Sequence, residues 1–284
     1  MADETTKDAA ATSQDKPAKA PKKQEKAERK GFHLFHPAMD FTDEPLHKHN
    51  WFMYVAGFII RPVAYLLFRI EVRGKENIPA ADGEPVLYVA NHVSFSDPVV
   101  MWVSTYPRVT RFLARSNLWR FPVLKGIISR VGAIPVDPES ADTKAIKRAA
   151  AALKRGECVG IFAEGTRMRN PEKVYKPHAG FVLIANMGKA KIVPVGITGT
   201  DRIKPPGQKL LHLPKVTITY GEAFSVKDFA DVPKAERTQA IVDETMRRVF
   251  ELRDAADFRG PIRPGLPPFG IVEGVDTAQD EAAE

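Results

Sequence analysis

The chain has 284 residues, of which 44% are hydrophobic and 27% are charged, a composition typical of a globular protein rather than a disordered or fully membrane-embedded one. Its formal net charge of +7 indicates attraction to an anionic partner, and nucleic acid and anionic lipid both qualify. The single cysteine, Cys158, excludes an internal disulfide and lies in an apolar run, which predicts a reducing, cytosolic setting. No basic segment followed by an apolar one opens the chain, so we expect no secretory signal.

The two ends of the chain differ in composition from the middle. Residues 1–40 include the Lys-rich stretch KPAKAPKKQEKAERK, which lacks the interleaved aromatic residues that stack on bases, so we expect a disordered tail and no nucleic-acid partner. Residues 256–284 are rich in Pro and Gly and end in acidic residues, which also predicts disorder.

Residues 41–70 predict a helical segment at a membrane interface. Arg61-Pro62 divides the run WFMYVAGFIIRPVAYLLFRI into two apolar limbs, each shorter than the roughly 20 residues that span a bilayer. Aromatic side chains with polar tips, such as Tyr54 and Tyr65, suit a kinked helix or a helix pair lying in the interface. The alternative is a helix that packs on the main domain, and the sequence leaves both open.

Residues 71–255 alternate short apolar runs with helical patterns. The runs VLYVA, GAIPV, CVGIFA, IVPVGI and KVTITY have the length and β-branched content of strands. Residues 141–156 form an Ala-rich amphipathic helix pattern that ends at Gly156, a good C-cap residue, and residues 234–256 form another amphipathic pattern. This alternation predicts an α/β domain with a mostly parallel central sheet flanked by helices.

The strand VLYVA is followed at once by Asn91 and His92, and Asp97 comes five residues after the histidine. Ligands bind at such strand ends in open α/β sheets. Asp97 precedes Pro98, which is typical of an N-cap followed by the first helical residue, so we expect a strand-to-helix turn across which the two side chains meet. A carboxylate bonded to one imidazole nitrogen leaves the other nitrogen free to accept a proton, which suits a general base. Taken alone, the spacing fits a helix cap beside an unrelated loop histidine equally well.

A second polar cluster, FAEGTRMRN, begins at Phe162 at the end of another strand. Gly165 allows the backbone to approach a ligand closely, Thr166 offers a hydroxyl, and the Arg167 guanidinium suits two phosphate oxygens. Glu164 suits a polar headgroup or an arginine partner. Taken alone, this stretch is typical of an ordinary polar turn.

Two other kinds of site are not expected. No G-x-S-x-G nucleophile elbow occurs and Cys158 lies in a predicted core strand, so a covalent acyl-enzyme has no obvious nucleophile. The pairs His33 with His36 and His47 with His49 have metal-like spacings but lack a third ligand nearby, so we expect no metal site.

Together, NHVSFSD, FAEGTR about seventy residues later and IVPVGI beyond it resemble the glycerolipid acyltransferase family, whose best-known members are the lysophosphatidate acyltransferases. The resemblance runs from about Val72 to Tyr220. It implies that His92 is the general base and that Asp97 orients it. It also implies that acceptor binding falls to Glu164, Gly165, Thr166 and Arg167. The apolar V-P motif, Val193-Pro194, is associated in the family with the acyl chain.

The family's second motif is matched less well. The family has a lysine before Glu-Leu, then a glycine and an arginine that helps to bind the acceptor phosphate. Here Arg115 stands at the lysine position and Pro138 stands where the arginine is expected. The resemblance implies that Arg115 assists Arg167, and it leaves the acceptor open.

The resemblance therefore implies an O-acyltransferase of phospholipid biosynthesis, without a metal or other cofactor. The acyl thioester of coenzyme A or of acyl carrier protein would be the donor, and 1-acylglycerol 3-phosphate the acceptor, giving phosphatidate. An acyltransferase or transacylase acting on another lysolipid or an aminolipid would share every motif. A non-enzymatic membrane or nucleic-acid binding protein would not explain two polar clusters at strand ends. We expect a peripheral or monotopic position on the cytoplasmic face of the cell membrane.

Overall fold

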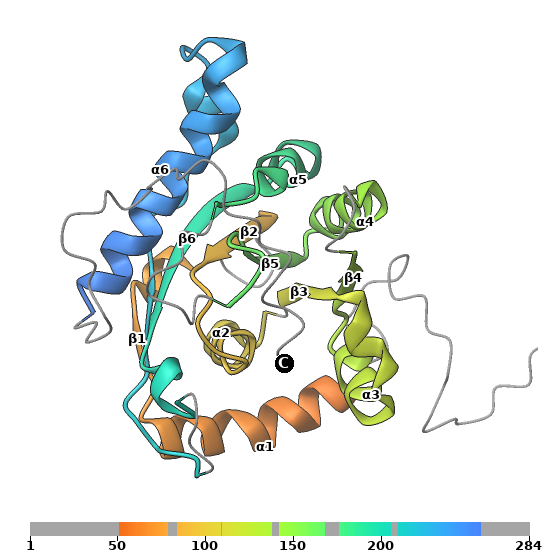
Figure 1. Ribbon diagram of the computed structural model, residues 1–284, viewed down its shortest axis with the longest axis vertical. Coiled ribbons are helices and arrows are strands. Elements are labelled where there is room, and N and C mark those ends of the chain that lie inside the picture. Colours follow the sequence, from red (N-terminus) through yellow and green to blue (C-terminus); the bar gives the residue numbers. More distant parts are fainter. Residues whose placement is uncertain are drawn as a thin grey trace, which may run out of the picture. The chain divides into compact units, whose positions relative to one another are not determined.

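The computed structural model describes residues 51–78, 84–108, 110–137, 142–167, 176–205 and 210–256. Within these ranges the centre is a seven-stranded sheet in the order β1-β7-β6-β2-β5-β3-β4 (Figure 1). The strands are β1 Glu71–Arg73, β2 Val86–Ala90, β3 Thr110–Arg115, β4 Ile134–Val136, β5 Cys158–Phe162, β6 Lys191–Thr198 and β7 Thr217–Tyr220. Every neighbouring pair is parallel except β6 with β7, so the predicted mostly parallel α/β sheet is confirmed.

Helices cover both faces of the sheet, with α1 and α2 on one side and α4, α5 and α6 on the other (Figure 1). The α-helices are α1 Trp51–Phe68, α2 Asp97–Thr105, α3 Pro122–Arg130, α4 Thr143–Lys154, α5 Gly180–Gly188 and α6 Lys234–Asp254. Short 3-10 helices are η2 Lys75–Asn77, η3 Ser116–Arg120, η4 Thr200–Arg202 and η5 Val226–Phe229.

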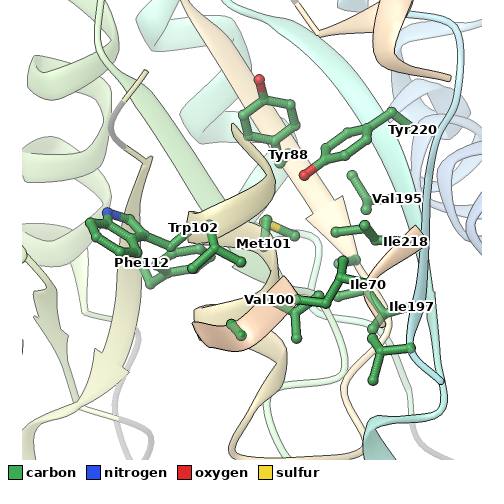
Figure 2. Packing of buried hydrophobic residues seen from close by; sticks show 14 of the residues in the cluster. Ile70, Tyr88, Val100, Met101, Trp102, Phe112, Val195, Ile197, Ile218 and Tyr220 are labelled. Atoms are coloured by element: carbon green, nitrogen blue, oxygen red, sulfur yellow. The ribbon is translucent and has the colours of Figure 1, made fainter. Parts of the chain in front are cut away.

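The two faces of β2 bury alternate residues, as the period of a strand requires. Tyr88 belongs to the apolar cluster that includes residues of α1 and α2, and its neighbour Val89 belongs to the cluster on the other face. Figure 2 shows Tyr88, Met101 of α2 and Phe112 among the buried side chains of this first face. All five residues of β2 are buried, which is typical of a central parallel strand and explains its continuous apolar run.

The five predicted strands and the predicted helices are found. The sheet also contains β1 and β3, which were not expected from the sequence. In β3, Arg111 is almost fully buried and pairs with Glu157, the residue before β5, with 2.5 Å between Nε and Oε2. A charged residue within a strand hides the apolar pattern by which strands are recognised.

The segment expected at the membrane interface is a single helix from its first described residue. α1 runs through Pro62 without ending, so the alternative of a helix pair is wrong. Met53, Ala56 and Ala64 are buried against the domain on either side of the proline, and this packing holds the helix together although Pro62 donates no backbone hydrogen bond. None of the helices in the described ranges is both long and apolar enough to cross a bilayer. The expected tails, 1–40 and 256–284, lie outside these ranges except for Ala256.

Candidate active site

Asn91 ties the end of β2 to the neighbouring strand β6. Its side-chain Nδ2 donates to the carbonyl oxygen of Ile197 over 2.9 Å, and its Oδ1 accepts the backbone N–H of Ile197 over 2.8 Å. Asn91 is fully buried. The side chain therefore takes the place that a further strand residue would occupy, and it fixes the point at which His92 leaves the sheet.

His92 and Asp97 meet as the sequence predicts. The distance from His92 Nδ1 to Asp97 Oδ2 is 2.8 Å. Because Oδ2 also accepts the backbone N–H groups of Val93 and Ser94, at 2.7 and 2.8 Å, the carboxylate acts as an acceptor throughout. Nδ1 therefore carries the proton, and the opposite ring nitrogen, Nε2, has the lone pair.

The imidazole is held by a second contact and remains accessible. Its ring stacks on Phe162 at the end of β5, with 4.2 Å between ring centroids and an angle of 23° between planes. The side chain of His92 is 17% exposed whereas that of Asp97 is not exposed at all. A buried carboxylate behind a partly exposed imidazole is the arrangement of a general base with its orienting group.

The prediction that Asp97 caps its own helix is wrong. Ser96 is the N-cap of α2, and Asp97 is already the first helical residue, followed by Pro98. The carboxylate instead turns back and accepts hydrogen bonds from the loop before the helix. The carboxylate can turn back because the loop N–H groups of Val93 and Ser94 are close enough to bond it.

Thr200, which was not predicted from the sequence, also forms a hydrogen bond with Asp97. Its hydroxyl donates to Oδ1 over 2.5 Å, and both residues are fully buried. Thr200 begins η4, directly after β6, and is 103 residues from Asp97. No local spacing signals such a contact.

Glu164 lies in the turn after β5 and is only 4% exposed. Neither carboxylate oxygen makes a hydrogen bond within the described part of the chain. Burial, reinforced by the charge of Asp97, raises the pKa of Glu164 to about 8. The backbone N–H groups of Glu164 and His92 lower it in part, without reaching hydrogen-bond geometry. At neutral pH the carboxyl group of Glu164 is therefore neutral.

The turn after β5 brings the predicted acceptor-binding residues to the same edge of the sheet. Gly165 has φ +69°, and a Cβ there would lie 2.5 Å from His178 Nε2, so only glycine fits. Its carbonyl oxygen lies 3.4 Å from Nη2 of Arg115, a long contact from the end of β3. The guanidinium carbon of Arg167 lies 3.8 Å from the ring centroid of Phe95, which is 64% exposed. The structure thus places Arg115 against the turn after β5 and Arg167 against the loop between His92 and Asp97, while Pro138 lies outside the described residues.

Val193 and Pro194 lie inside the sheet and not at its carboxyl edge. Both are buried, and Pro194 is paired with Val89 of β2. Their expected association with the acyl chain stays a prediction. Cys158, at the start of β5, is fully buried, and burial raises the pKa of its thiol to about 11. A thiol in this state is a poor nucleophile.

Metal ligation finds no support within the described ranges, where no three His, Cys, Asp or Glu side chains come together in a way that could hold a metal ion. The paired histidines of the N-terminal part, His33, His36, His47 and His49, lie outside those ranges.

Comparison with known proteins identifies the family of this chain. The acyltransferase family profile matches residues 69–198. A 1-acyl-sn-glycerol-3-phosphate acyltransferase of Bacillus subtilis is 31% identical over 188 residues, which cover 66% of this chain and 90% of the relative. The chain belongs to the acyltransferase family. It is therefore an acyl-transferring enzyme, as the resemblance of its motifs implies.

Two further acyltransferases broaden the comparison. A lyso-ornithine lipid O-acyltransferase of Pseudomonas aeruginosa is 29% identical over 142 residues, which cover 50% of this chain and 52% of the relative. The crystal structure of a 1-acyl-sn-glycerophosphate acyltransferase from Thermotoga maritima superimposes with a TM-score of 0.53 at 22% identity, covering 71% of this chain and 87% of that one. This likeness confirms the fold.

Proposed function

We propose that this acyltransferase moves a fatty acyl group from an acyl thioester to the free hydroxyl of a lysophospholipid, with 1-acylglycerol 3-phosphate as the acceptor and phosphatidate as the product. The observation that carries the proposal is the His92–Asp97 pair at the carboxyl edge of the sheet, with Nδ1 and Oδ2 2.8 Å apart. The name of the Bacillus subtilis relative supports the choice of acceptor.

In the proposed mechanism His92 acts as the base. Its Nε2 removes the proton of the acceptor hydroxyl while the hydroxyl oxygen attacks the thioester carbonyl carbon. The carbon–sulfur bond then breaks, and the imidazolium returns the proton to the thiolate that leaves. Asp97 stabilises the imidazolium, and its three N–H and O–H partners besides His92 keep it in place. The buried, protonated thiol of Cys158 supports direct transfer without a covalent intermediate.

The acceptor is proposed to lie between the turn after β5 and the end of β3. Arg167, assisted by Arg115, would hold the phosphate through paired N–H donors. Glu164 would donate a hydrogen bond from its neutral carboxyl group, and Gly165 would let the backbone approach. Thr166 would add a hydroxyl. The proximity of Arg115 to Gly165 supports grouping these residues in one site.

Another acceptor is the second candidate, and two observations favour it. Pro138 stands where the family usually has a phosphate-binding arginine, and one relative is named for an ornithine lipid acceptor. If the acceptor is a phosphate monoester, replacing Pro138 with arginine should leave turnover of lysophosphatidate equal or higher. A fall in that turnover with a phosphate-free lysolipid acylated faster than lysophosphatidate would favour the second candidate.

We also propose that the enzyme works at a membrane surface, on the cytoplasmic face of the cell membrane. On α1, Phe58 is 82% exposed and Leu66 is 79% exposed, in a helix whose one charged residue is Arg61. The Arg61 guanidinium lies 5.7 Å from the Tyr65 ring and 5.8 Å from the Tyr106 ring, an aromatic setting that suits the headgroup level of a bilayer. Large apolar side chains are also exposed on α3 and in the 210–213 segment.

A single experiment tests the proposed reaction. Purified full-length chain is incubated with a labelled acyl thioester, on coenzyme A or on acyl carrier protein, and with a panel of lysolipids, and the products are identified by mass. The panel should include lysophosphatidate, zwitterionic lysolipids and lyso-ornithine lipid. Phosphatidate formed faster than any other product is the expected result, with His92→Ala as the control. A product from another acceptor at a higher kcat/KM would overturn the choice of lysophosphatidate.

A further inference from the structure

The carboxylate of Asp97 receives hydrogen bonds from two directions. Oδ2 accepts from His92 Nδ1 and from the backbone of Val93 and Ser94, all within five residues of the chain. Oδ1 accepts from the hydroxyl of Thr200, which comes from the far end of β6. Since Asp97 and Thr200 are both fully buried, water does not reach this oxygen to replace the hydroxyl.

The two sets of donors do different things. Turning the carboxylate about its Cβ–Cγ bond would move both oxygens, and the loop N–H groups oppose this turning only through Oδ2. Thr200 opposes it through Oδ1 as well, so the plane of the carboxylate is held from both sides. Because a donor prefers to lie near the plane of the oxygen that it bonds, this plane decides the direction in which the imidazole of His92 is held.

The chain places Thr200 for this contact by a tight turn. Gly199 has φ +88°, and a Cβ at this position would collide with the carbonyl oxygen of Lys215. A glycine is therefore required between the end of β6 and η4. The turn directs the threonine hydroxyl from β6 to the first residue of α2, which joins two elements that the loop donors do not connect.

We propose that Thr200 is a positioning residue of the catalytic pair, acting through Asp97 on the orientation and the proton affinity of His92. The proposal rests on the proposed role of His92 as the base. A threonine donor shares the negative charge of the carboxylate, so its removal leaves more of that charge for the imidazolium.

Other charged groups near Asp97 could also affect the titration of His92. Glu164, in the turn after β5, is buried beside Asp97, and Arg253 of α6 acts on Glu164 through its charge. Because the pKa of Glu164 is raised to about 8, its carboxyl group is neutral over most of the range in which a histidine titrates. Repeating each measurement in a Glu164→Gln background removes the remaining influence of this group.

The test compares Thr200→Val, which removes the hydroxyl at nearly constant volume, with Thr200→Ser, which keeps it. Loss of a hydrogen bond to a charged group should lower kcat about ten- to a hundredfold, with the acceptor KM unchanged, and serine should restore most of the loss. Thr245→Val is the matched control. Thr245 is equally buried and donates to the carbonyl oxygen of Ile241 within α6, so this variant loses a buried hydroxyl away from the site.

A second measurement does not depend on turnover. The titration of His92 is followed by NMR of histidine labelled at Cε1, with His92→Ala identifying the resonance. We expect the midpoint in Thr200→Val to move to higher pH and the acid limb of the kcat profile to move with it. Thr200→Ala serves as a smaller replacement if the valine variant is not folded.

The outcomes separate the two proposals. An unchanged His92 titration in a folded Thr200→Val or Thr200→Ala chain would overturn the positioning role, as would a loss of kcat no greater than that of Thr245→Val. If His92→Ala kept wild-type turnover, the base assignment would fail, and the NMR titration would still decide whether Thr200 controls the imidazole.

Discussion

Replacing Glu164 with glutamine should stabilise the protein, and the gain should depend on pH. Glutamine has nearly the same shape as a protonated glutamate and cannot ionise. The carboxyl group of Glu164 has an ordinary pKa of 4.5 in the unfolded chain and a pKa of about 8 in the fold. The folded state therefore retains a proton that the unfolded state gives up, so the stability from this group is full below pH 4.5 and is lost as the pH rises toward 8.

The size of the stability gain follows from the difference between the two pKa values of Glu164. Between pH 4.5 and pH 7 the wild-type fold loses about 1.4 kcal/mol for each pH unit, so Glu164→Gln should gain about 3 kcal/mol at pH 7 and almost nothing near pH 4.5. For a domain of this size, that gain raises Tm by about 6 to 12 °C. Thermal unfolding of wild type and Glu164→Gln between pH 5 and pH 8.5 measures the difference directly.

The control is Glu222→Gln, because Glu222 is exposed and its replacement should change Tm by a similar small amount at every pH. A Tm difference for Glu164→Gln that is absent, or that does not grow with pH, would show that Glu164 is ionised in the fold and that the account of its burial is wrong. The KM for an anionic acceptor supplies a second check. It should rise above pH 8 in the wild type, because the ionised carboxylate repels phosphate, and it should stay level in the glutamine variant.

Three further outcomes are expected. His92→Ala should lower kcat by a factor of about 10² to 10⁴ with the circular dichroism spectrum unchanged, and Asp97→Asn should cause a similar loss. A near-normal kcat in both variants would refute the role of His92 as the general base. Arg167→Lys should raise the KM of a phosphate acceptor about ten- to a hundredfold, since a point charge replaces a paired donor, and an unchanged KM would place the phosphate elsewhere. Phe58→Ser should weaken binding to anionic vesicles, measured by co-sedimentation, about tenfold or more at every salt concentration. Deleting residues 1–30 should weaken this binding at low salt only. The reverse pattern would exclude α1 from the lipid contact.

Much of the fold follows from local pattern. β2, β5 and β6 are buried on both faces, so their sequences are short, continuous apolar runs that stand out without any knowledge of the fold. The helix at residues 141–156 was equally clear, and Gly156 takes φ +81° just after its end. β3 was not predicted because it contains the charged residue Arg111. Burial of Arg111 is possible because it pairs with Glu157, which only the fold brings near.

In the candidate site, contacts between residues close in sequence could be predicted and contacts between distant residues could not. His92 and Asp97 are five residues apart, so a turn between a strand and a helix is enough to predict their contact. Thr200 reaches Asp97 across 103 residues, and the neutral state of Glu164 depends on burial by several elements. Neither is visible in a stretch of sequence. The expectation that Asp97 is the N-cap of α2 was wrong, because cap preferences do not say that nearby loop N–H groups compete for the same carboxylate.

The side chain of Asn91 has a consequence for how this enzyme can diversify. Since it occupies a rung between β2 and β6, one residue inserted or deleted within β2 would turn the asparagine away from Ile197 and carry the imidazole to the opposite face of the sheet. The number of residues between β2 and His92 therefore cannot change without moving the imidazole. New acceptor preferences would have to come from elements that can lengthen or shorten without moving this rung, such as the connection after η4 and the approach to α3.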